Sequence, residues 1–327
     1  MVAALGLATP ASGGPKHEVC PHSAALGTVT FSRGGHEHAI SLATCADRIV
    51  GRSTPTAGQP LRSRDGRITA IVRATGTGRS AKQTIWITDR RTHASRAIFS
   101  ETQSYKQIGP GDTPGPIVLL RVSSDDRWVF FTIDPGGSGS IAADGLVLRV
   151  LSTAGGPVHK LGVALPYPDY LTWCGGRLVY VGGKDRVAIH AKRLLVAAPP
   201  NWRPALLWAG HSRSFSTPAC RPGGKSVAVL AQRSSMDANF FATRWQLWRV
   251  GLDGTRQELD APPAGWADEA PRWSRDGRSL LFVRERKGYG RVMLLRDGRV
   301  FGPIAKLGFA SGYYGRHDWQ LGWSVGA

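Results

Sequence analysis

The stretch PRWSRDGRS at residues 271–279 runs directly into the apolar segment LLFV at residues 280–283. An Asp-Gly pair supplies the residues that adopt positive φ in a tight β-hairpin turn. A short apolar run that follows such a turn is typical of a strand buried on both faces. We therefore expect a hairpin here, with its second strand inside a protein core.

The same pattern recurs along the chain. The other copies are PLRSRDGR at 60–67 before ITAIV, SSDDR at 123–127 before WVFF, WCGGR at 173–177 before LVYV, and PACRPGGKS at 218–226 before VAVL. The turn anchors, one in each copy, are Gly66, Asp126, Gly176, Gly224 and Gly277, and their spacings are 60, 50, 48 and 53 residues. A repeat of about 50 residues with short antiparallel strands is the size of a propeller blade.

The five copies cover residues 60–308 and leave both ends of the chain for one more blade. Residues 318–323 can form its innermost strand, and the segments 28–32, 38–43 and 48–50 can form its outer strands. Pairing the two ends closes the ring and removes open sheet edges. The sequence therefore predicts an all-β fold, a six-bladed β-propeller, with seven blades as the alternative.

The segment EAPRWSRDGR at residues 269–278 resembles the blade signature of TolB-like β-propellers, Pro-x-Trp-Ser-Pro-Asp-Gly-Lys/Arg. The Pro between Ser and Asp is replaced by Arg275 here and by Arg64 in the first copy. The resemblance covers residues 60–308, and with the ending Tyr-Tyr-Gly at 313–315 the pattern looks like a group of secreted actinobacterial proteins of unknown role. The resemblance implies a platform for binding other proteins, since TolB-like propellers are known in that role.

The chain is strongly basic, with 42 Lys+Arg against 23 Asp+Glu in 327 residues and a formal charge of +19. Such a charge favours polyanions. The arginines are spread along the chain without a basic run, however, and a genomic bias toward Arg gives the same excess. We expect no nucleic-acid partner, and we keep an anionic polymer as an alternative ligand. No apolar stretch is long enough to predict a transmembrane helix.

The N-terminus and the cysteines bear on localisation. Residues 1–15 are either the remnant of a signal peptide without its positive region or a disordered tail, and residues 16–327 are expected to form a single propeller domain. The even number of cysteines favours an exported protein with the disulfides Cys20–Cys45 and Cys174–Cys220. The second pair falls on neighbouring innermost strands.

Catalytic and metal-binding motifs are not found. The segment GGKS at 223–226 has Ala219 where a phosphate-binding loop needs its first Gly, and no Gly-x-Ser-x-Gly elbow occurs. A zinc site can be drawn from Cys20, His22, His36, His38 and Cys45, but the two later histidines follow a Gly-Gly turn that indicates an exposed hairpin tip. We predict no catalytic residue, no metal ligand and no cofactor.

The loops that lead into the innermost strands of a propeller gather at one mouth of its channel, where aromatic and charged residues favour recognition. The candidate ligand-binding residues in these loops are Tyr105, Lys106, Asp169, Tyr170, His211, Arg213, Asp268, Glu269, Tyr314, His317 and Asp318. The alternative for each residue is a structural role in a blade joint or a turn.

We predict a monomeric, non-catalytic propeller outside the cytoplasm that binds a protein or a cell-wall component. The first alternative is an enzyme of the glycan lyase or hydrolase type, which two or more buried ionisable groups with shifted pKa values at the channel mouth would favour. The second is capture of an anionic polymer by the arginines.

Overall fold

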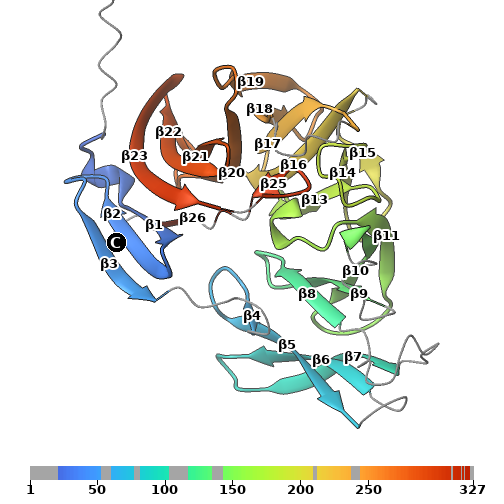
Figure 1. Cartoon of the computed structure of the whole chain (residues 1–327). Coiled ribbons are helices and arrows are strands. Elements are labelled where there is room, and N and C mark those ends of the chain that lie inside the picture. The colour runs from blue at the N-terminus through green and yellow to red at the C-terminus, as the bar shows by residue number, and fades with distance from the viewer. Residues whose placement is uncertain are drawn as a thin grey trace, which may run out of the picture.

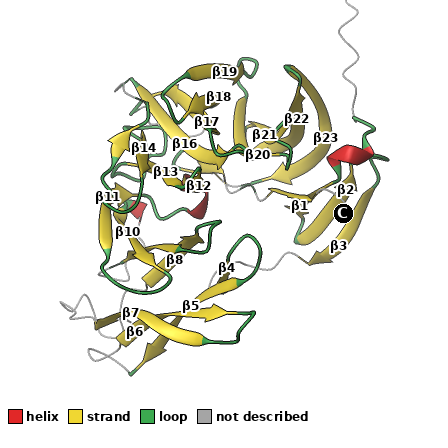
Figure 2. Cartoon of the chain, turned by 180° about the vertical axis from the view of Figure 1, so that it is seen from behind, coloured by secondary structure: helices red, strands yellow, loops and turns green. Residues whose placement is uncertain are grey.

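Six four-stranded antiparallel sheets stand around a central channel in the computed structural model (Figure 1). The structure describes residues 21–52, 60–76, 82–102, 117–134, 143–208, 212–236, 244–310, 312–317, 319 and 321–324. The predicted all-β, six-bladed propeller is confirmed, and the alternative of seven blades is wrong. Seen from behind, each sheet has the same neighbours, and the blades follow one another in the opposite sense around the channel (Figure 2).

The chain builds five blades in succession, each from the innermost strand outward. Blade 2 holds β4 Leu61–Arg62, β5 Ile68–Thr75, β6 Lys82–Asp89 and β7 Ser95–Thr102. Blade 3 holds β8 Ile117–Val122, β9 Trp128–Ile133, β10 Leu146–Ser152 and β11 His159–Ala164. Blade 4 holds β12 Leu171–Cys174, β13 Arg177–Gly182, β14 Arg193–Ala197 and β15 Ala205–Leu206. Blade 5 holds β16 Arg213–Cys220, β17 Ser226–Arg233, β18 Gln246–Gly251 and β19 Arg256–Asp260. Blade 6 holds β20 Ala267–Trp273, β21 Ser279–Arg286, β22 Tyr289–Arg296 and β23 Arg299–Phe309.

Blade 1 joins the two ends of the chain, as the sequence predicts. Its innermost strand is the last of the chain, β26 Leu321–Ser324, which pairs with β1 Thr28–Arg33; β2 His36–Ser41 and β3 Asp47–Arg52 complete the sheet. The register places Val29 opposite Trp323 and Phe31 opposite Leu321. These apolar pairs stabilise the closure of the ring.

The five predicted turn anchors all adopt positive φ, between 62° at Asp126 and 76° at Gly176. In three blades the serine before the turn is bonded in the same way. In blade 6, Ser274 Oγ donates to Asp276 Oδ1 at 2.6 Å and accepts a hydrogen bond from Ser279 N at 2.9 Å. Ser63 and Ser123 repeat this arrangement in blades 2 and 3. The repeated Ser-x-Asp pattern thus fixes the turn that aligns the two inner strands.

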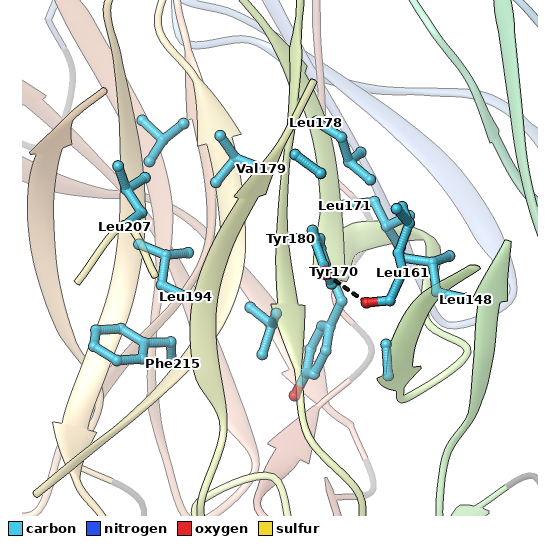
Figure 3. Close-up of a cluster of buried hydrophobic side chains, with 14 of the residues drawn as sticks. Leu148, Leu161, Tyr170, Leu171, Leu178, Val179, Tyr180, Leu194, Leu207 and Phe215 are labelled. Carbon is cyan, nitrogen blue, oxygen red and sulfur yellow. Dashed lines mark hydrogen bonds between the residues drawn. The ribbon is translucent and has the colours of Figure 1, made fainter. Parts of the chain in front are cut away.

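Apolar side chains between adjacent blades form the core. The largest cluster lies between blades 3, 4 and 5 and includes Leu178, Val179 and Phe215, which are fully buried (Figure 3). Tyr180 is buried in this cluster, and its hydroxyl donates a hydrogen bond of 2.6 Å to the carbonyl oxygen of Leu161 (Figure 3). A polar atom at this depth is tolerated because it has a partner.

Blade 2 departs from the expectation that the strand after each turn is buried on both faces. In β17 of blade 5 six consecutive residues are buried, whereas in β5 of blade 2 only Ile68 and Ala70 are. These two residues face blade 3, and the other face of the sheet carries Thr69, Ile71 and Arg73. This second face of blade 2, called the polar face below, therefore presents polar and charged side chains beside Ile71.

The predicted disulfide Cys174–Cys220 is present and joins the ends of β12 and β16, with Cα atoms 5.3 Å apart. It lies beside the contact between two hairpin turns, where Gly175 of blade 4 meets Gly224 of blade 5. Cys20 lies outside the described residues, so the bond Cys20–Cys45 stays a prediction.

A short hairpin, β24 Gly312–Tyr313 and β25 Arg316–His317, precedes the closing strand. Figure 1 shows β25 beside β16 near the middle of the ring. The hairpin is held by blades 4 and 5: Ala188 N donates to Tyr314 O at 2.8 Å, and Trp245 Nε1 donates to Gly315 O at 3.1 Å. The hairpin therefore covers part of one channel mouth.

Helical segments are short in the described parts of the chain, and they include the 3-10 turns η1 Ala24–Leu26 and η3 Pro168–Tyr170. Among the described residues, no helix has the length and apolar character needed to cross a membrane.

Candidate functional site

Four charged side chains gather at the channel mouth from blades on different sides of the ring. Arg121 comes from β8 in blade 3, Arg272 from β20 in blade 6, Asp169 from η3 before blade 4, and Arg316 from the hairpin β24–β25. We call these four residues the channel-mouth cluster. The cluster thus contains three arginines and one aspartate.

Local backbone irregularities position the two strand-borne arginines. The pairing of β8 with β9 shifts register between Leu119 and Arg121, and that of β20 with β21 shifts between Glu269 and Arg272. Bulges of this kind bend a strand and re-aim its side chains. In β20, Ala270 adopts φ of 50°, an uncommon value for a residue with a side chain.

The positive charges are held where water stabilises them poorly. Burial, together with the nearby charge of Arg272, lowers the pKa of Arg121 from its ordinary value to about 10. Burial also lowers the pKa of Arg272, which the charge of Asp169 only partly opposes. Both arginines remain charged at neutral pH, because Arg121 would lose its proton only near pH 10.

The cluster is only partly satisfied by its own contacts. Arg316 Nη2 donates to Asp169 Oδ2 at 2.9 Å, and Arg121 Nη2 donates to the carbonyl oxygen of Pro168 at 2.9 Å. The guanidinium of Arg316 also lies 4.2 Å from the centroid of the Tyr167 ring. Within the described residues, Arg121 Nε and Asp169 Oδ1 are buried without a hydrogen-bond partner. A buried donor without a partner is a cost that a bound acceptor would remove.

A second group of charges lies behind the hairpin. Glu269 of β20, Glu285 of β21 and His317 of β25 are 4%, 2% and 6% exposed, and their ligand atoms all lie within 4.8 Å of one another. His317 Nδ1 lies 3.1 Å from Glu269 Oε1, within hydrogen-bond distance. Burial raises the pKa of Glu269, although the hydrogen bond from His317 opposes the change. Burial alone would lower the pKa of His317, but the hydrogen bond and charge of Glu269 outweigh it, so the pKa of His317 is raised.

The neighbouring acid Asp268 is fully buried against Arg284. Arg284 Nε donates to Asp268 Oδ1 at 2.8 Å, and Arg284 also pairs with Asp260. Burial raises the pKa of Asp268 to about 7 despite this partner. The buried ionisable groups that the sequence analysis set as the mark of an enzyme are thus found, but Asp268 and Glu269 each have a basic partner within the protein.

The predicted site residues separate into three groups. The first group lies in or beside the two charge groups and comprises Asp169, Tyr170, Asp268, Glu269, Tyr314 and His317. Within it, Tyr170 is fully buried and packs in the core. The second group is Arg213 alone, which lies apart over the rings of Trp208 and Trp248. Tyr105, Lys106, His211 and Asp318 lie outside the described residues. That these residues bind a ligand stays a prediction.

The sequence analysis missed Arg121, Arg272, Arg316 and Glu285. The first two lie inside strands rather than loops, and only the bulges direct them to the channel. Of the zinc ligands drawn from the sequence, His36 is exposed at the end of the β1–β2 hairpin, as the Gly-Gly turn indicated. His38 is instead buried, stacks on Phe31 at 5.4 Å and lies 2.9 Å from Asp47.

A separate basic hollow lies on the polar face of blade 2. It has a volume of about 720 Å³, and its lining includes Arg67, Arg73, Arg90, Arg91 and His93. Asp65 also lines the hollow, and Arg67 is paired with Asp89 at 3.1 Å. The remaining arginines give the hollow a positive charge.

Comparisons with known proteins define the fold but not a family. No protein-family model and no curated protein matches the chain. Among solved structures, TolB from Acinetobacter baumannii is similar over 92% of this chain and 67% of its own, with 14% identity and a TM-score of 0.50. The propeller domain of the Trilobed protease from Pyrococcus furiosus matches 81% of this chain and 73% of its own, with 13% identity and a TM-score of 0.46. An oligogalacturonate lyase from Vibrio parahaemolyticus matches 84% of this chain and 72% of its own, with 12% identity and a TM-score of 0.47. The chain shares the TolB-like propeller fold.

Proposed function

We propose that this chain is a non-catalytic propeller that acts outside the cytoplasm and binds an acidic group of a protein or cell-envelope component at its channel mouth. The observation that carries the proposal is the pair Arg121 and Arg272 in the channel-mouth cluster, which approach from opposite blades closely enough for the charge of Arg272 to lower the pKa of Arg121. Hydrogen bonds from arginine to a carboxylate or phosphate are about twice as strong as neutral ones. An acidic ligand group would therefore offset the repulsion between Arg121 and Arg272 and accept a hydrogen bond from Arg121 Nε.

The disulfide Cys174–Cys220 supports a location outside the cytoplasm, because such bonds persist in oxidising compartments. In this proposal residues 16–327 form one monomeric propeller domain, residues 1–15 are a signal remnant or tail, and the chain belongs with the secreted actinobacterial proteins that its repeat resembles. Mass spectrometry of the natural protein, recovered from culture medium or from cells, tests the location.

The binding role can be tested by calorimetric titration with inorganic phosphate at constant ionic strength. The wild-type chain is expected to show one saturable site. The double variant Arg121→Gln/Arg272→Gln is expected to bind at least tenfold more weakly, because two charged donors are lost. Arg299→Gln, an exposed arginine on the outermost strand of blade 6, is the matched control and is expected to bind as the wild type does. Equal affinity in all three proteins, or no saturable site in the wild type, would overturn the proposal.

An enzyme is the second candidate, and the observation in its favour is the buried group of Asp268, Glu269 and His317 at the channel mouth. General acids and bases are often carboxyl and imidazole groups with perturbed pKa values. Turnover of an acidic glycan by the wild type, lost in His317→Gln, would favour this candidate and contradict the non-catalytic role.

Capture of an anionic polymer is the third candidate, favoured by the basic hollow of blade 2. The logarithm of the binding constant for long-chain polyphosphate would then fall linearly with the logarithm of salt concentration. The slope reports the number of phosphate contacts, so Arg73→Gln/Arg91→Gln would reduce it by the equivalent of about two contacts. The channel variants would leave the slope unchanged.

A further inference from the structure

Three ligand-type residues come together from different strands, and the anion-binding role explains none of them. They are Glu269, Glu285 and His317. Glu269 lies on the innermost strand of blade 6, Glu285 on the next strand, and His317 on the hairpin that crosses the channel mouth. The two that are nearest in sequence, Glu269 and Glu285, are 16 residues apart, so no short sequence motif predicts the group. The fold nevertheless brings one nitrogen and two carboxylate ligands within 4.8 Å of one another.

Carboxylates are crowded at this place. Glu269 and Glu285 lie beside the single imidazole of His317, and the charge of Arg316, which is paired with Asp169, also acts on this group. The neighbouring Asp260 and Asp268 share Arg284. Gathering carboxylates in a buried place is costly, so this place favours a bound cation.

The geometry suits a small metal ion. Two ligand atoms that are each about 2.0–2.1 Å from a tetrahedral zinc ion lie about 3.3 Å apart. The distance from His317 Nδ1 to Glu269 Oε1 is 3.1 Å, so these two atoms already have nearly that spacing. Glu285 Oε2 accepts a hydrogen bond of 2.9 Å from Gly288 N, which orients its carboxylate as outer contacts orient metal ligands.

We propose that Glu269, Glu285 and His317 bind one divalent transition-metal ion, of the zinc or manganese class, that fastens the hairpin β24–β25 to blade 6. Imidazole nitrogen together with carboxylate oxygen suits these ions, whereas calcium and magnesium select oxygen ligands. Three protein ligands leave a position for water, as in sites where the ion is not fully enclosed by protein. The ion offsets the charge of the two carboxylates.

The same ion would order the channel mouth. His317 is adjacent to Arg316, whose guanidinium holds Asp169 across the mouth at 2.9 Å. Tying His317 to two strands of blade 6 therefore fixes the strand that carries one arginine of the channel-mouth cluster. The metal site itself does not depend on what the mouth binds.

The test uses the full-length chain without a tag, stripped of metal with a chelator and returned to metal-free buffer. Calorimetric titration with zinc chloride is expected to show one site per chain. Glu285→Gln and His317→Gln are each expected to lower zinc affinity at least tenfold. His38→Gln, which removes a buried histidine paired with a single carboxylate, is the matched control and keeps the affinity. Absence of a saturable site, or unchanged affinity in His317→Gln, would overturn the proposal.

Fluorescence provides a second readout that does not need those variants to fold. The Trp319 ring lies 6.0 Å from the His317 ring, so a quenching ion such as Cu²⁺ or Co²⁺ at this site would reduce its emission. Trp319→Phe is expected to bind one ion with unchanged affinity but to lose that part of the quenching. Equal quenching in the wild type and in Trp319→Phe would place the ion elsewhere and overturn the assignment.

Discussion

Replacing Arg121 with glutamine is expected to make the folded protein more stable, because this arginine costs stability in the channel. Its pKa falls by more than two units to about 10, and each unit corresponds to about 1.4 kcal/mol. The upper limit of the cost is therefore about 3 kcal/mol. Arg121 is partly exposed, so solvent screening lowers this limit, and the variant also weakens the hydrogen bond to Pro168, worth about 1 kcal/mol. A net gain of about 1 kcal/mol is the expected result.

Urea unfolding of the wild type and Arg121→Gln, followed by circular dichroism, measures this difference at pH 7. Arg284→Gln is the informative comparison, since Arg284 is paired with Asp268 and Asp260 and is only 13% exposed. Removing one partner of a buried ion pair costs about 3–5 kcal/mol. The two arginine variants should thus change stability in opposite directions. Destabilisation of Arg121→Gln by more than about 1 kcal/mol would show that Arg121 is a structural residue and would refute the reasoning.

Three further variants test the framework. Removing the disulfide with Cys174→Ser and Cys220→Ser is expected to lower the free energy of unfolding by about 4 kcal/mol, the chain-entropy value for a separation of 46 residues, as measured by urea unfolding without reductant. Gly224→Ala is expected to lower the melting temperature far more than Gly223→Ala: both glycines have positive φ, but only the Cβ at 224 would meet backbone, at 2.7 Å, in the adjoining turn of blade 4. Burial lowers the pKa of Lys192 to about 8, so the folded chain binds fewer protons there than the unfolded chain between pH 8 and 10.5, and its unfolding free energy rises with pH in that window. The rise, at most about 3 kcal/mol because three carbonyl oxygens stabilise the charged form, should be missing from pH-dependent unfolding curves of Lys192→Met.

The sequence was sufficient to predict the blades because each blade repeats the same local physics. A residue at positive φ recurs at the five inner hairpins, and in blades 2, 3 and 6 a Ser-x-Asp pattern accompanies it, as at Ser274, Asp276 and Gly277. Cys174 and Cys220 could be paired because that repeat aligns the ends of their two strands. The closing blade followed from the count of strands at the two ends.

The functional residues were harder to predict because they depend on irregularities in the repeat. Arg121 and Arg272 occupy strand positions that a regular ladder would direct elsewhere, and a bulge beside each one changes that. His317 could be proposed from its place before the closing strand, but its partner Glu285 could not, since no local pattern links the two. The polar face of blade 2 could not be predicted from the turn motif, because that motif is intact in this blade.

Site-specific photo-crosslinking in cells that naturally express the protein tests the central claim most directly. A photoreactive residue at Tyr167, which lies against Arg316 at the channel mouth, is compared with one at Arg299, an exposed position on the outermost strand of blade 6. We expect one extracytoplasmic partner to be captured from position 167 and not from position 299, and to be lost when Arg121→Gln and Arg272→Gln are added. Capture of the same molecules from both positions, or a partner that persists without the two arginines, would contradict binding at the channel mouth.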